Sequence, residues 1–310
     1  MSTRICIVGC GAIGGLYAAH LAQLDGVEVW AYDVSAEHVV AINAHGLRLT
    51  GHVALTAEVH ARVDPDGIPA CSFGIVATKG TFTRAAIEAT QRVFADGAVC
   101  SVQNGIGNEE VIAEYVPRVI RGVTLPAGRV TEPGVVRMYG GGTTWIGPFE
   151  PRPATMAEVR ELGALCHRSG METVALDDAR PPQWTKLLFN CATNPLCALT
   201  GLTHGEMWDV AAMHDLVSGL VDEGLRVADA LGITPDGDPK ALIAELAHVN
   251  YDHQPSMLQD VLAHRRTEIA TLNGGIVQAG AACGVPTPLN QAIAALIAGL
   301  ELSWGGATGT

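Results

Sequence analysis

The sequence has few basic residues and few charges of either sign. Lysine and arginine together number 19 against 32 aspartates and glutamates, so the formal net charge is −13. Nucleic acids and anionic membrane surfaces also carry negative charge, and this balance argues against both as partners. A small acidic substrate is not excluded, because a local basic site can exist in an acidic protein.

Long apolar runs and paired cysteines are also missing. No clean apolar run of about 20 residues is present, so no membrane span is expected. Four glycines interrupt the apolar start "MSTRICIVGCGAIGGLYAAHLA", which argues against a signal peptide. The eight cysteines do not show paired metal-ligand spacing. We therefore expect no metal, and reduced, mostly buried thiols in a cytoplasmic protein.

What the sequence does have is an apolar composition and an alternation of short strands and helices. Of its 310 residues 48% are hydrophobic, enough for two domains with large cores. Strands are expected at 4–9, 27–33, 72–78 and 97–105, and helices at 36–46 and 83–95. This alternation predicts an α/β domain with a Rossmann-type, doubly wound parallel sheet.

The later segments change character. Residues 128–148 read as strands joined by a turn at Glu132-Pro133-Gly134, which predicts a hairpin at the edge of the sheet. From about Thr185 onward the pattern is helical. We therefore expect a dinucleotide-binding domain at 1–178 and an all-helical substrate-binding and catalytic domain at 179–310, with a frayed tail at 305–310.

The stretch "GCGAIG" matches the G-x-G-x-x-G pattern between a strand and a helix. Gly9 allows the tight turn, Gly11 lets the backbone approach a pyrophosphate, and Gly14 lets helix and sheet pack closely. Ala12 and Ile13 start the helix, whose N-terminus favours phosphate. The sequence predicts that these five residues bind a dinucleotide.

Asp33 ends the second strand, 19 residues after Gly14. A carboxylate here can accept hydrogen bonds from both ribose hydroxyls of NAD and would repel the 2′-phosphate of NADP. Asp33 could also be a turn or helix-capping residue, although Ser35 could cap equally well. We expect a preference for NAD(H).

The stretch "KLLFNCATNP" places Lys186, Asn190 and Asn194 four residues apart, on nearly one face of a helix. Spacing alone leaves two interpretations open, a polar site or a snorkelling surface lysine with two ordinary polar neighbours. Asn194 also precedes Pro195, so it could cap a new helical segment.

Four motifs together resemble the ketopantoate reductase (2-dehydropantoate 2-reductase) family: "IVGCGAIGGLYAAHLA", "QNGIGNEEVI", "KLLFNCATNPLCALTGL" and "SMLQDVLAHRRTEIATLNG". They occur in order over nearly the whole chain. The resemblance implies reduction of a 2-oxo acid by hydride transfer from a nicotinamide, with a Rossmann domain followed by a helical domain. It also implies a role in pantothenate biosynthesis.

The resemblance implies two catalytic residues. Lys186 would be the general acid that protonates the ketone oxygen, and Glu268 would lie beside the reacting group and the nicotinamide ribose. Asn104 would contact both cofactor and substrate. The residues alone leave open that Asn104 is a turn residue and that Glu268 is an exposed helix carboxylate paired with Arg265 or Arg266.

The substrate-binding residues implied by the resemblance are Asn190, Asn194 and Ser256, for the hydroxyl and carboxylate oxygens. Ser256 with Gln259 also fits a capping box, and both roles can coexist. Lys79, at the end of a strand, would reach the cofactor or the substrate, or else be a solvated loop lysine.

Two residues depart from the family pattern. Asp33 stands where the family, usually NADP(H)-dependent, has a basic or neutral residue. His204 stands where it usually has a substrate-binding Asn. A histidine is bulkier and can be charged near pH 6.5. It would contact a different substrate side chain, or be a helix-start residue without contact.

The leading prediction is therefore a reductase converting 2-dehydropantoate to (R)-pantoate. One alternative is an NAD-linked D-2-hydroxy acid dehydrogenase of the same family acting on another branched or aromatic acid. Another, of a different class, is a non-catalytic NAD(H)-binding sensor. The sequence leaves the physiological direction open, and the oligomeric state too, a homodimer included.

Overall fold

A computed structural model describes residues 2–305, which fold into two compact units. The first unit contains the chain up to Gln103 and Asn108–Ala179, and the second contains Asn104–Gly107 and the chain from Arg180 onward. The predicted frayed tail, apart from Gly305, lies outside the described residues. None of the described helices combines the length and the apolar character needed to cross a membrane.

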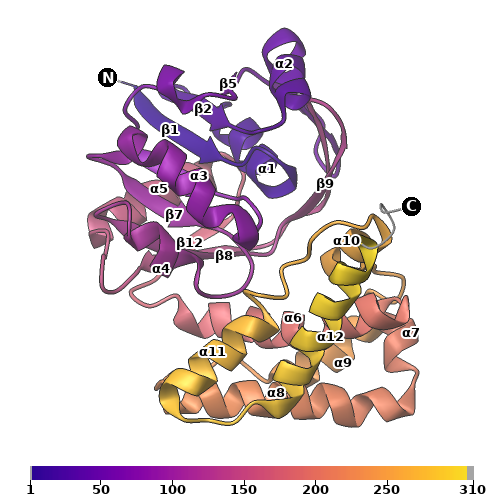
Figure 1. Cartoon of the computed structure of the whole chain (residues 1–310). Coiled ribbons are helices and arrows are strands. Elements are labelled where there is room, and N and C mark those ends of the chain that lie inside the picture. The colour runs from indigo at the N-terminus through magenta and orange to yellow at the C-terminus, as the bar shows by residue number, and fades with distance from the viewer. Residues whose placement is uncertain (1, 306–310) are drawn as a thin grey trace. The chain divides into compact units, whose positions relative to one another are not determined.

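The first unit is an α/β structure (Figure 1). Its strands are β1 (Thr3–Val8), β2 (Val27–Tyr32), β3 (Leu47–Gly51), β4 (Leu55–Ala57), β5 (His60–Arg62), β6 (Phe73–Val76), β7 (Ala98–Ser101), β8 (Val119–Thr124), β9 (Ala127–Glu132), β10 (Val135–Gly140), β11 (Thr144–Pro148) and β12 (Thr173–Ala175). Its helices are α1 (Ala12–Leu21), α2 (Ala36–His45), α3 (Thr83–Thr90), α4 (Asn108–Ala113) and α5 (Met156–Arg168), with 3-10 turns η1 (Pro65–Gly67), η2 (Gly80–Phe82) and η3 (Gln91–Phe94). The predicted helix at 83–95 is thus an α-helix that ends in a 3-10 turn.

Eight strands form the main sheet, in the order β12-β11-β8-β7-β6-β1-β2-β5. From β8 to β5 all neighbours pair in parallel, whereas β11 pairs antiparallel with β8 and β12 pairs in parallel with β11. In β1, Ile5 and Ile7 pack with α1 and α5 on one face, whereas Cys6 and Val8 pack with α3 and α4 on the other. This alternation buries both faces and confirms the doubly wound parallel sheet.

The predicted edge hairpin is part of a separate sheet. β9 and β10 pair antiparallel around the turn at Glu132–Gly134, but they belong to a four-stranded sheet of order β4-β3-β10-β9. This sheet packs on α1, where Val136 contacts Gly15. The prediction of a hairpin at the edge of the main sheet was wrong because β3, which pairs with β10, and β4, which pairs with β3, were not recognised in the sequence. Of the three strands in this segment, only β11 belongs to the main sheet.

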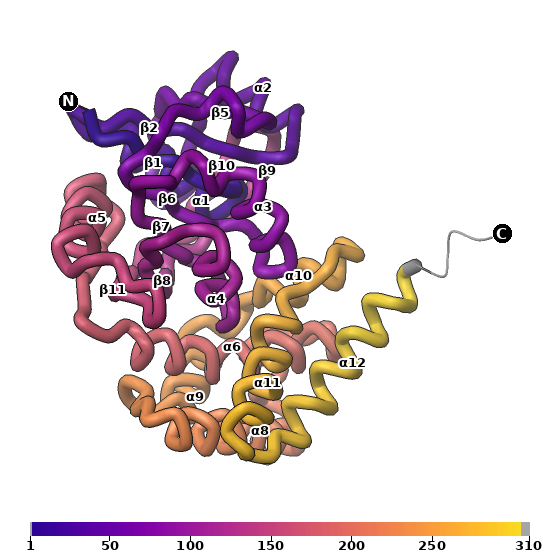
Figure 2. The backbone as a smooth tube through the Cα atoms, turned by 60° about the vertical axis from the view of Figure 1, so that its left-hand side comes forward, coloured from indigo at the N-terminus to yellow at the C-terminus, as the bar shows by residue number. Residues whose placement is uncertain are grey.

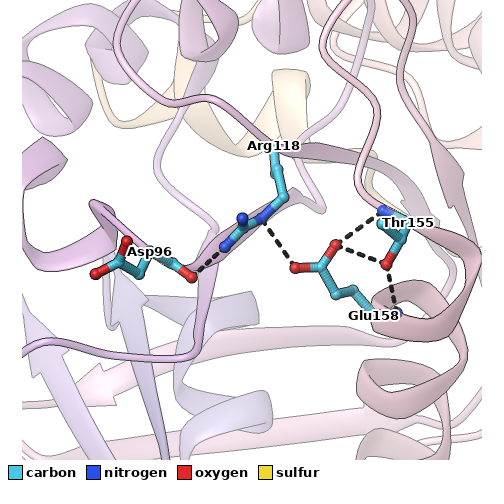
Figure 3. A network of polar contacts seen from close by, with 4 residues as sticks. All are labelled: Asp96, Arg118, Thr155 and Glu158. Carbon is cyan, nitrogen blue, oxygen red and sulfur yellow. Dashed lines mark hydrogen bonds and ion pairs between the residues drawn. The ribbon is translucent and has the colours of Figure 1, made fainter.

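The N-terminus of α5 illustrates how polar groups fix the helices of this unit (Figure 3). Thr155 and Glu158 form a capping box, in which Glu158 Oε2 accepts from the Thr155 backbone N–H at 2.8 Å. Glu158 Oε1 also lies 2.9 Å from Nε of Arg118, whose guanidinium donates to the carbonyl of Asp96. One carboxylate thus caps the helix and contacts Arg118, the residue just before β8.

The second unit is helical. Its helices are α6 (Arg180–Thr200), α7 (His204–Trp208), α8 (Ala211–Ala230), α9 (Pro239–Val249), α10 (Ser256–Leu262), α11 (Asn273–Cys283) and α12 (Pro288–Gly305). α8 packs against α6, α11 and α12, and the latter two lie side by side in both views (Figures 1 and 2). One half of α6 contributes Leu187 and Leu188 to one apolar cluster, and the other half contributes Leu196 to a second.

Helix α6 continues through Pro195, so Asn194 does not cap a new helical segment. Proline has no backbone N–H, and the carbonyl of Cys191, four residues earlier, loses its usual helical partner. The buried side chain of Asn273 replaces it, because its Nδ2 donates to Cys191 O at 2.9 Å. The neighbouring helix α11 thus satisfies the carbonyl that Pro195 leaves unpaired.

Candidate active site

The glycine loop of the first unit presents open backbone at the N-terminus of α1. A Cβ on Gly11, the N-cap residue, would meet nothing within 4 Å. Gly9 has φ of +88°, and a Cβ there would lie 2.6 Å from Thr78 Cγ2. A Cβ on Gly14 would collide with the carbonyl oxygen of Gly9. The loop is therefore tight where strand meets helix and open where a pyrophosphate would approach the first N–H groups of α1.

Ala12 and Ile13 occupy the first two positions of α1, as the motif predicts. Their backbone N–H groups, like that of Gly11, belong to the first turn and have no partner within a helix. No acidic side chain lies in that turn. The residues of this loop thus fit a bound pyrophosphate, whose charge the helix dipole favours.

Asp33 is held next to this loop by two backbone groups. Its Oδ2 accepts from the N–H of Cys10, and its Oδ1 accepts from the N–H of Ser35, both at 2.9 Å. Ser35 is the N-cap of α2 and accepts from His38 N, so Asp33 does not have the capping role. Each carboxylate oxygen retains a lone pair with which to accept from a ribose hydroxyl.

A pocket of about 250 Å³ opens beside Asp33. It is lined by Gly11, Asp33, Ser35, His38, Val130, Thr131, Glu132 and Pro133. Two of these residues are carboxylates and none is a lysine or arginine, which disfavours an additional phosphate. Glu132, from the β9–β10 hairpin, was not anticipated, because 99 residues of sequence separate it from Asp33.

The sequence also concealed an arginine near this pocket. β5 pairs with the end of β2, and the N–H of Asp33 donates to the carbonyl of Arg62 at 3.1 Å. The guanidinium of Arg62, however, lies over the Trp30 ring, 5.3 Å from its centroid, and does not line the pocket.

Two residues follow strands β6 and β7 near the glycine loop. Lys79 precedes the 3-10 turn η2, where its carbonyl accepts from Phe82 N at 2.8 Å. Gln103, which sequence reasoning missed, donates from Nε2 to the carbonyl of Thr78 at 2.9 Å and to Thr83 Oγ1 at 2.7 Å. Because Thr78 packs against Gly9, Gln103 supports the loop.

The second unit brings Lys186, Asn104 and Glu268 into one hydrogen-bonded chain. Lys186 Nζ donates to Asn104 Oδ1 at 2.8 Å, and Asn104 Nδ2 donates to Glu268 Oε2 at 2.9 Å. Asn104 belongs to the four-residue segment that packs with this unit, where the N–H of Ile106 donates to Thr271 O at 2.9 Å. The two bonds together fix which end of the Asn104 amide faces the lysine.

Lys186 is partly buried on α6, and this changes its protonation. Burial lowers the pKa of Lys186 to about 8, and the charge of Glu268 opposes that shift. A lysine with a pKa of about 8 can both donate and accept a proton near neutral pH, which suits a general acid and base. Lys186 is thus no snorkelling surface lysine.

Glu268 lies in an irregular segment between α10 and α11, so the interpretation as a helix carboxylate was wrong. The preceding residue, Thr267, donates from its backbone N and its Oγ1 to Glu301 Oε1 of α12, at 2.8 and 2.6 Å. Arg265 forms an ion pair with Asp260 at 3.2 Å. Glu301, which the sequence did not reveal as a site residue, therefore holds the segment that carries Glu268.

Of the predicted substrate-binding residues, Asn190 and Asn194 are buried on α6, one and two turns beyond Lys186. Asn194 Oδ1 accepts from Thr193 Oγ1 at 3.4 Å. Ser256 is exposed at the first position of α10, which packs on α6. The predicted capping box is wrong: Pro255 is the N-cap, and Gln259 Nε2 donates to the carbonyl of Gln254. The roles of all three residues in binding stay predictions.

His204 starts α7, and its side chain is only 3% exposed. Its ring lies 5.4 Å from the ring of Phe189 and 5.0 Å from that of His253. Within the described residues neither ring nitrogen has a hydrogen-bond partner. Burial, with a contribution from His253, lowers the pKa of His204 to about 4. The expectation of a charge near pH 6.5 was therefore wrong, and the ring is neutral.

A Rossmann-type unit with an open glycine loop and a helical unit with a partly buried lysine define a class of two-unit dinucleotide-binding proteins. Residues 5–151 match the family profile described as Ketopantoate reductase PanE/ApbA, and residues 178–301 match its C-terminal counterpart. The chain is 33% identical to the 2-dehydropantoate 2-reductase of Pyrococcus horikoshii, over 98% of this chain and 99% of that protein. The chain belongs to the ketopantoate reductase family.

Solved structures agree with this assignment. A PanE/ApbA family ketopantoate reductase from Ralstonia eutropha JMP134 is similar with a TM-score of 0.88 and 30% identity, covering 97% of this chain and 99% of that chain. The ternary structure of D-mandelate dehydrogenase with NADH and anilino(oxo)acetate is similar with a TM-score of 0.88 and 27% identity, with the same coverage.

Proposed function

We propose that the chain is a nicotinamide-dependent oxidoreductase that interconverts a 2-oxo acid and a 2-hydroxy acid. The leading substrate pair is 2-dehydropantoate and (R)-pantoate, which the full-length similarity to 2-dehydropantoate 2-reductase supports. The observation that carries the proposal is the hydrogen-bonded chain of Lys186, Asn104 and Glu268. A non-catalytic sensor would need the glycine loop but not this arrangement.

The chemistry of the proposed site follows from the charge that develops during reduction. A bound nicotinamide supplies or accepts the hydride. As the carbonyl carbon is reduced, negative charge accumulates on its oxygen, and the Lys186 ammonium stabilises that charge and donates its proton there. Glu268 raises the pKa of Lys186 against the effect of burial and so keeps the ammonium populated near neutral pH. Asn104 fixes the positions of both side chains by bonding to each of them.

Substrate recognition would use polar residues on the helices around Lys186. Asn190 and Asn194 share the face of α6 that carries Lys186, since positions four apart are one turn apart. Their amides would bind the carboxylate and hydroxyl oxygens, with Ser256 adding a hydroxyl from α10. Lys79, in the first unit, would reach the cofactor.

We infer further that the preferred cofactor is NAD(H) rather than NADP(H). The Asp33 carboxylate cannot turn away from a 2′-phosphate without breaking its bonds to Cys10 N and Ser35 N. Losing two such bonds would cost roughly 1–3 kcal/mol, in addition to the repulsion between like charges. Glu132, which also pairs with Arg48 at 3.3 Å, adds a second carboxylate to the pocket. The similar D-mandelate dehydrogenase was solved with NADH.

A second candidate within the same chemistry is an NAD-linked D-2-hydroxy acid dehydrogenase for a bulkier or aromatic acid. Two observations favour it. The fold is as similar to D-mandelate dehydrogenase as to a ketopantoate reductase. His204, neutral and packed against Phe189, would also place an aromatic ring near a substrate side chain.

One experiment separates these functions. Initial rates with a panel of 2-oxo acids, including 2-dehydropantoate and phenylglyoxylate, would be measured with NADH and with NADPH. The highest kcat/KM for 2-dehydropantoate supports the leading function, whereas the highest value for an aromatic acid supports the second. No turnover of any member, with NADH still binding, would identify a sensor.

The eight free cysteines are consistent with a cytoplasmic enzyme.

A further inference from the structure

His38 lies on α2 and touches two parts of the first unit that are far apart in sequence. Its side chain is 5% exposed and lines the pocket beside Asp33. The ring contacts the carbonyl oxygen of Cys10 through Nε2 at 2.9 Å and the backbone N–H of Gly134 through Nδ1 at 3.0 Å. These contacts reach 28 residues back to the glycine loop and 96 residues forward to the β9–β10 hairpin.

The two partners determine the protonation of the ring. The backbone N–H of Gly134 can only donate, so Nδ1 must accept and carries no proton. Nε2 then carries the proton and donates it to the carbonyl of Cys10. In this structure His38 is therefore a neutral imidazole of one defined tautomer.

The bond to Cys10 O has a consequence for the next N–H group. The Cys10 carbonyl and the Gly11 N–H belong to one planar trans peptide, so they point in opposite directions. Asp33 holds the N–H of Cys10 in addition. By holding the Cys10 carbonyl, His38 fixes the direction of the Gly11 N–H, one of the unpaired donors at the start of α1.

The bond to Gly134 holds the other side of the pocket. Gly134 has φ of +75°, and its carbonyl accepts from the N–H of Arg48 at 2.9 Å. A Cβ on Gly134 would lie 3.1 Å from the Cβ of Ala41 on α2. The turn is therefore pressed against α2, and the residues just before it, Val130–Pro133, form one wall of the pocket.

We propose that His38 is a positioning residue for the ADP-ribose half of the nicotinamide cofactor. Through one neutral imidazole it aims the Gly11 N–H toward the pyrophosphate and holds the hairpin wall against the adenosine ribose. The inference rests on the proposed use of a nicotinamide dinucleotide, but on no particular substrate.

The test uses ADP-ribose, which lacks the nicotinamide, with binding to the full chain measured by calorimetry. His38→Phe preserves an aromatic ring but can form neither bond, and its Kd for ADP-ribose should rise by roughly tenfold or more. The KM for NADH should rise in parallel, while kcat at saturating NADH and the KM for the 2-oxo acid change little. His38→Gln can reach the Cys10 carbonyl from the position of Nε2, and it should recover most of the affinity.

A control variant at His20 and a second variant at His38 separate loss of cofactor binding from loss of stability. His20 is a matched control, because it is buried in the same unit and bonds the carbonyl of Ser169 at 2.8 Å away from the pocket. His20→Phe should match His38→Phe in loss of thermal stability but bind ADP-ribose normally. If His38→Phe does not fold, His38→Asn replaces it, since its shorter amide reaches Gly134 but not Cys10.

Three results would overturn the proposal: ADP-ribose bound by His38→Phe within twofold of the unaltered chain, an equal loss in His20→Phe, or identical affinities of the Asn and Gln variants. Normal ADP-ribose binding in all variants with intact turnover would overturn the role of His38 alone. An unaltered chain that does not bind ADP-ribose would overturn the proposed cofactor as well.

Discussion

The ammonium of Lys186 donates a 2.8 Å hydrogen bond to the side-chain oxygen of Asn104, a residue 82 positions earlier in the chain. The amide nitrogen of Asn104 in turn donates to Glu268. The Glu268 carboxylate therefore affects Lys186 in two ways: by direct electrostatic attraction, and by orienting the Asn104 amide that accepts from the ammonium.

Replacing Lys186 with alanine should lower kcat by about two to four orders of magnitude, because it removes a proton donor and the charge that stabilises the developing oxyanion. Affinity for NADH should change little, since the glycine loop belongs to the other unit. Steady-state kinetics and NADH titration measure both. Lys240→Ala is the control, because Lys240 is partly exposed and pairs with Asp222 in an ion pair on the same unit. Near-normal turnover in Lys186→Ala would remove the lysine from the mechanism.

The pH dependence should follow the pKa of Lys186, which burial lowers to about 8. Reduction needs the ammonium, so its rate should fall as pH rises through about 8. Oxidation needs the free amine, so its rate should fall as pH drops below that value. Glu268→Gln removes a charge that raises this pKa and should move the alkaline limb of reduction to lower pH. If the alkaline limb of the pH–rate profile is unchanged in Glu268→Gln, a group other than Lys186 controls it.

The unaltered chain should prefer NADH over NADPH by at least about tenfold in kcat/KM, since 1.4 kcal/mol already gives that ratio. Asp33→Asn should narrow the preference by removing the repulsion, and Asp33→Arg should narrow or reverse it. Glu37→Gln is a suitable control, because Glu37 lies in the first turn of α2, four residues after Asp33, but does not line the pocket. Equal or better use of NADPH by the unaltered chain contradicts the argument.

His204→Asn should change the order in which 2-oxo acids are preferred, because it exchanges a neutral buried ring for a smaller amide. Rates with the panel of 2-oxo acids would be compared between the two proteins. His214→Asn is the control, since His214 lies at the exposed surface against Trp208. An unchanged order in His204→Asn would make this residue a packing element only.

Asn273→Ala should lower the free energy of unfolding by about 1–3 kcal/mol, because it leaves the Cys191 carbonyl without a partner and removes a bond to Asn290 Oδ1. Pro195→Ala restores a backbone N–H that can donate to that carbonyl. In this background the cost of Asn273→Ala should therefore be smaller. Urea denaturation of the four proteins in the double-mutant cycle measures the difference. Additive effects would separate Asn273 from Pro195.

Sequence periodicity predicted the parallel sheet and the helical second half because these elements have strong local patterns. Ile5 and Ile7 alternate with Cys6 and Val8, and the chain buries both faces of β1 accordingly. The second sheet was missed because β3 and β4 are short, and because β3 pairs with β10, more than 80 residues away.

For the site residues too, those in local motifs were predicted and those that depend on long-range contacts were missed. The motifs placed Lys186, Asn104 and Glu268 on the list of candidates, and the structure brings their side chains together. The supporting residues had no such motif. His38 and Glu301 act through contacts with residues 96 and 34 positions away, and no local pattern encodes either pairing. The Ser256 capping box failed because Pro255 takes the cap position instead.

The path of the chain through residues 104–107 limits how relatives of this protein could exchange parts. A single crossover at residue 179 would join Lys186 and Glu268 from one parent to Asn104 from the other, since Asn104–Gly107 packs with the second unit while both flanking segments belong to the first. Gly105 leaves no room for a side chain there, because its Cβ would collide with the Thr271 carbonyl. A working recombinant should therefore inherit this four-residue segment and everything after residue 179 from the same parent.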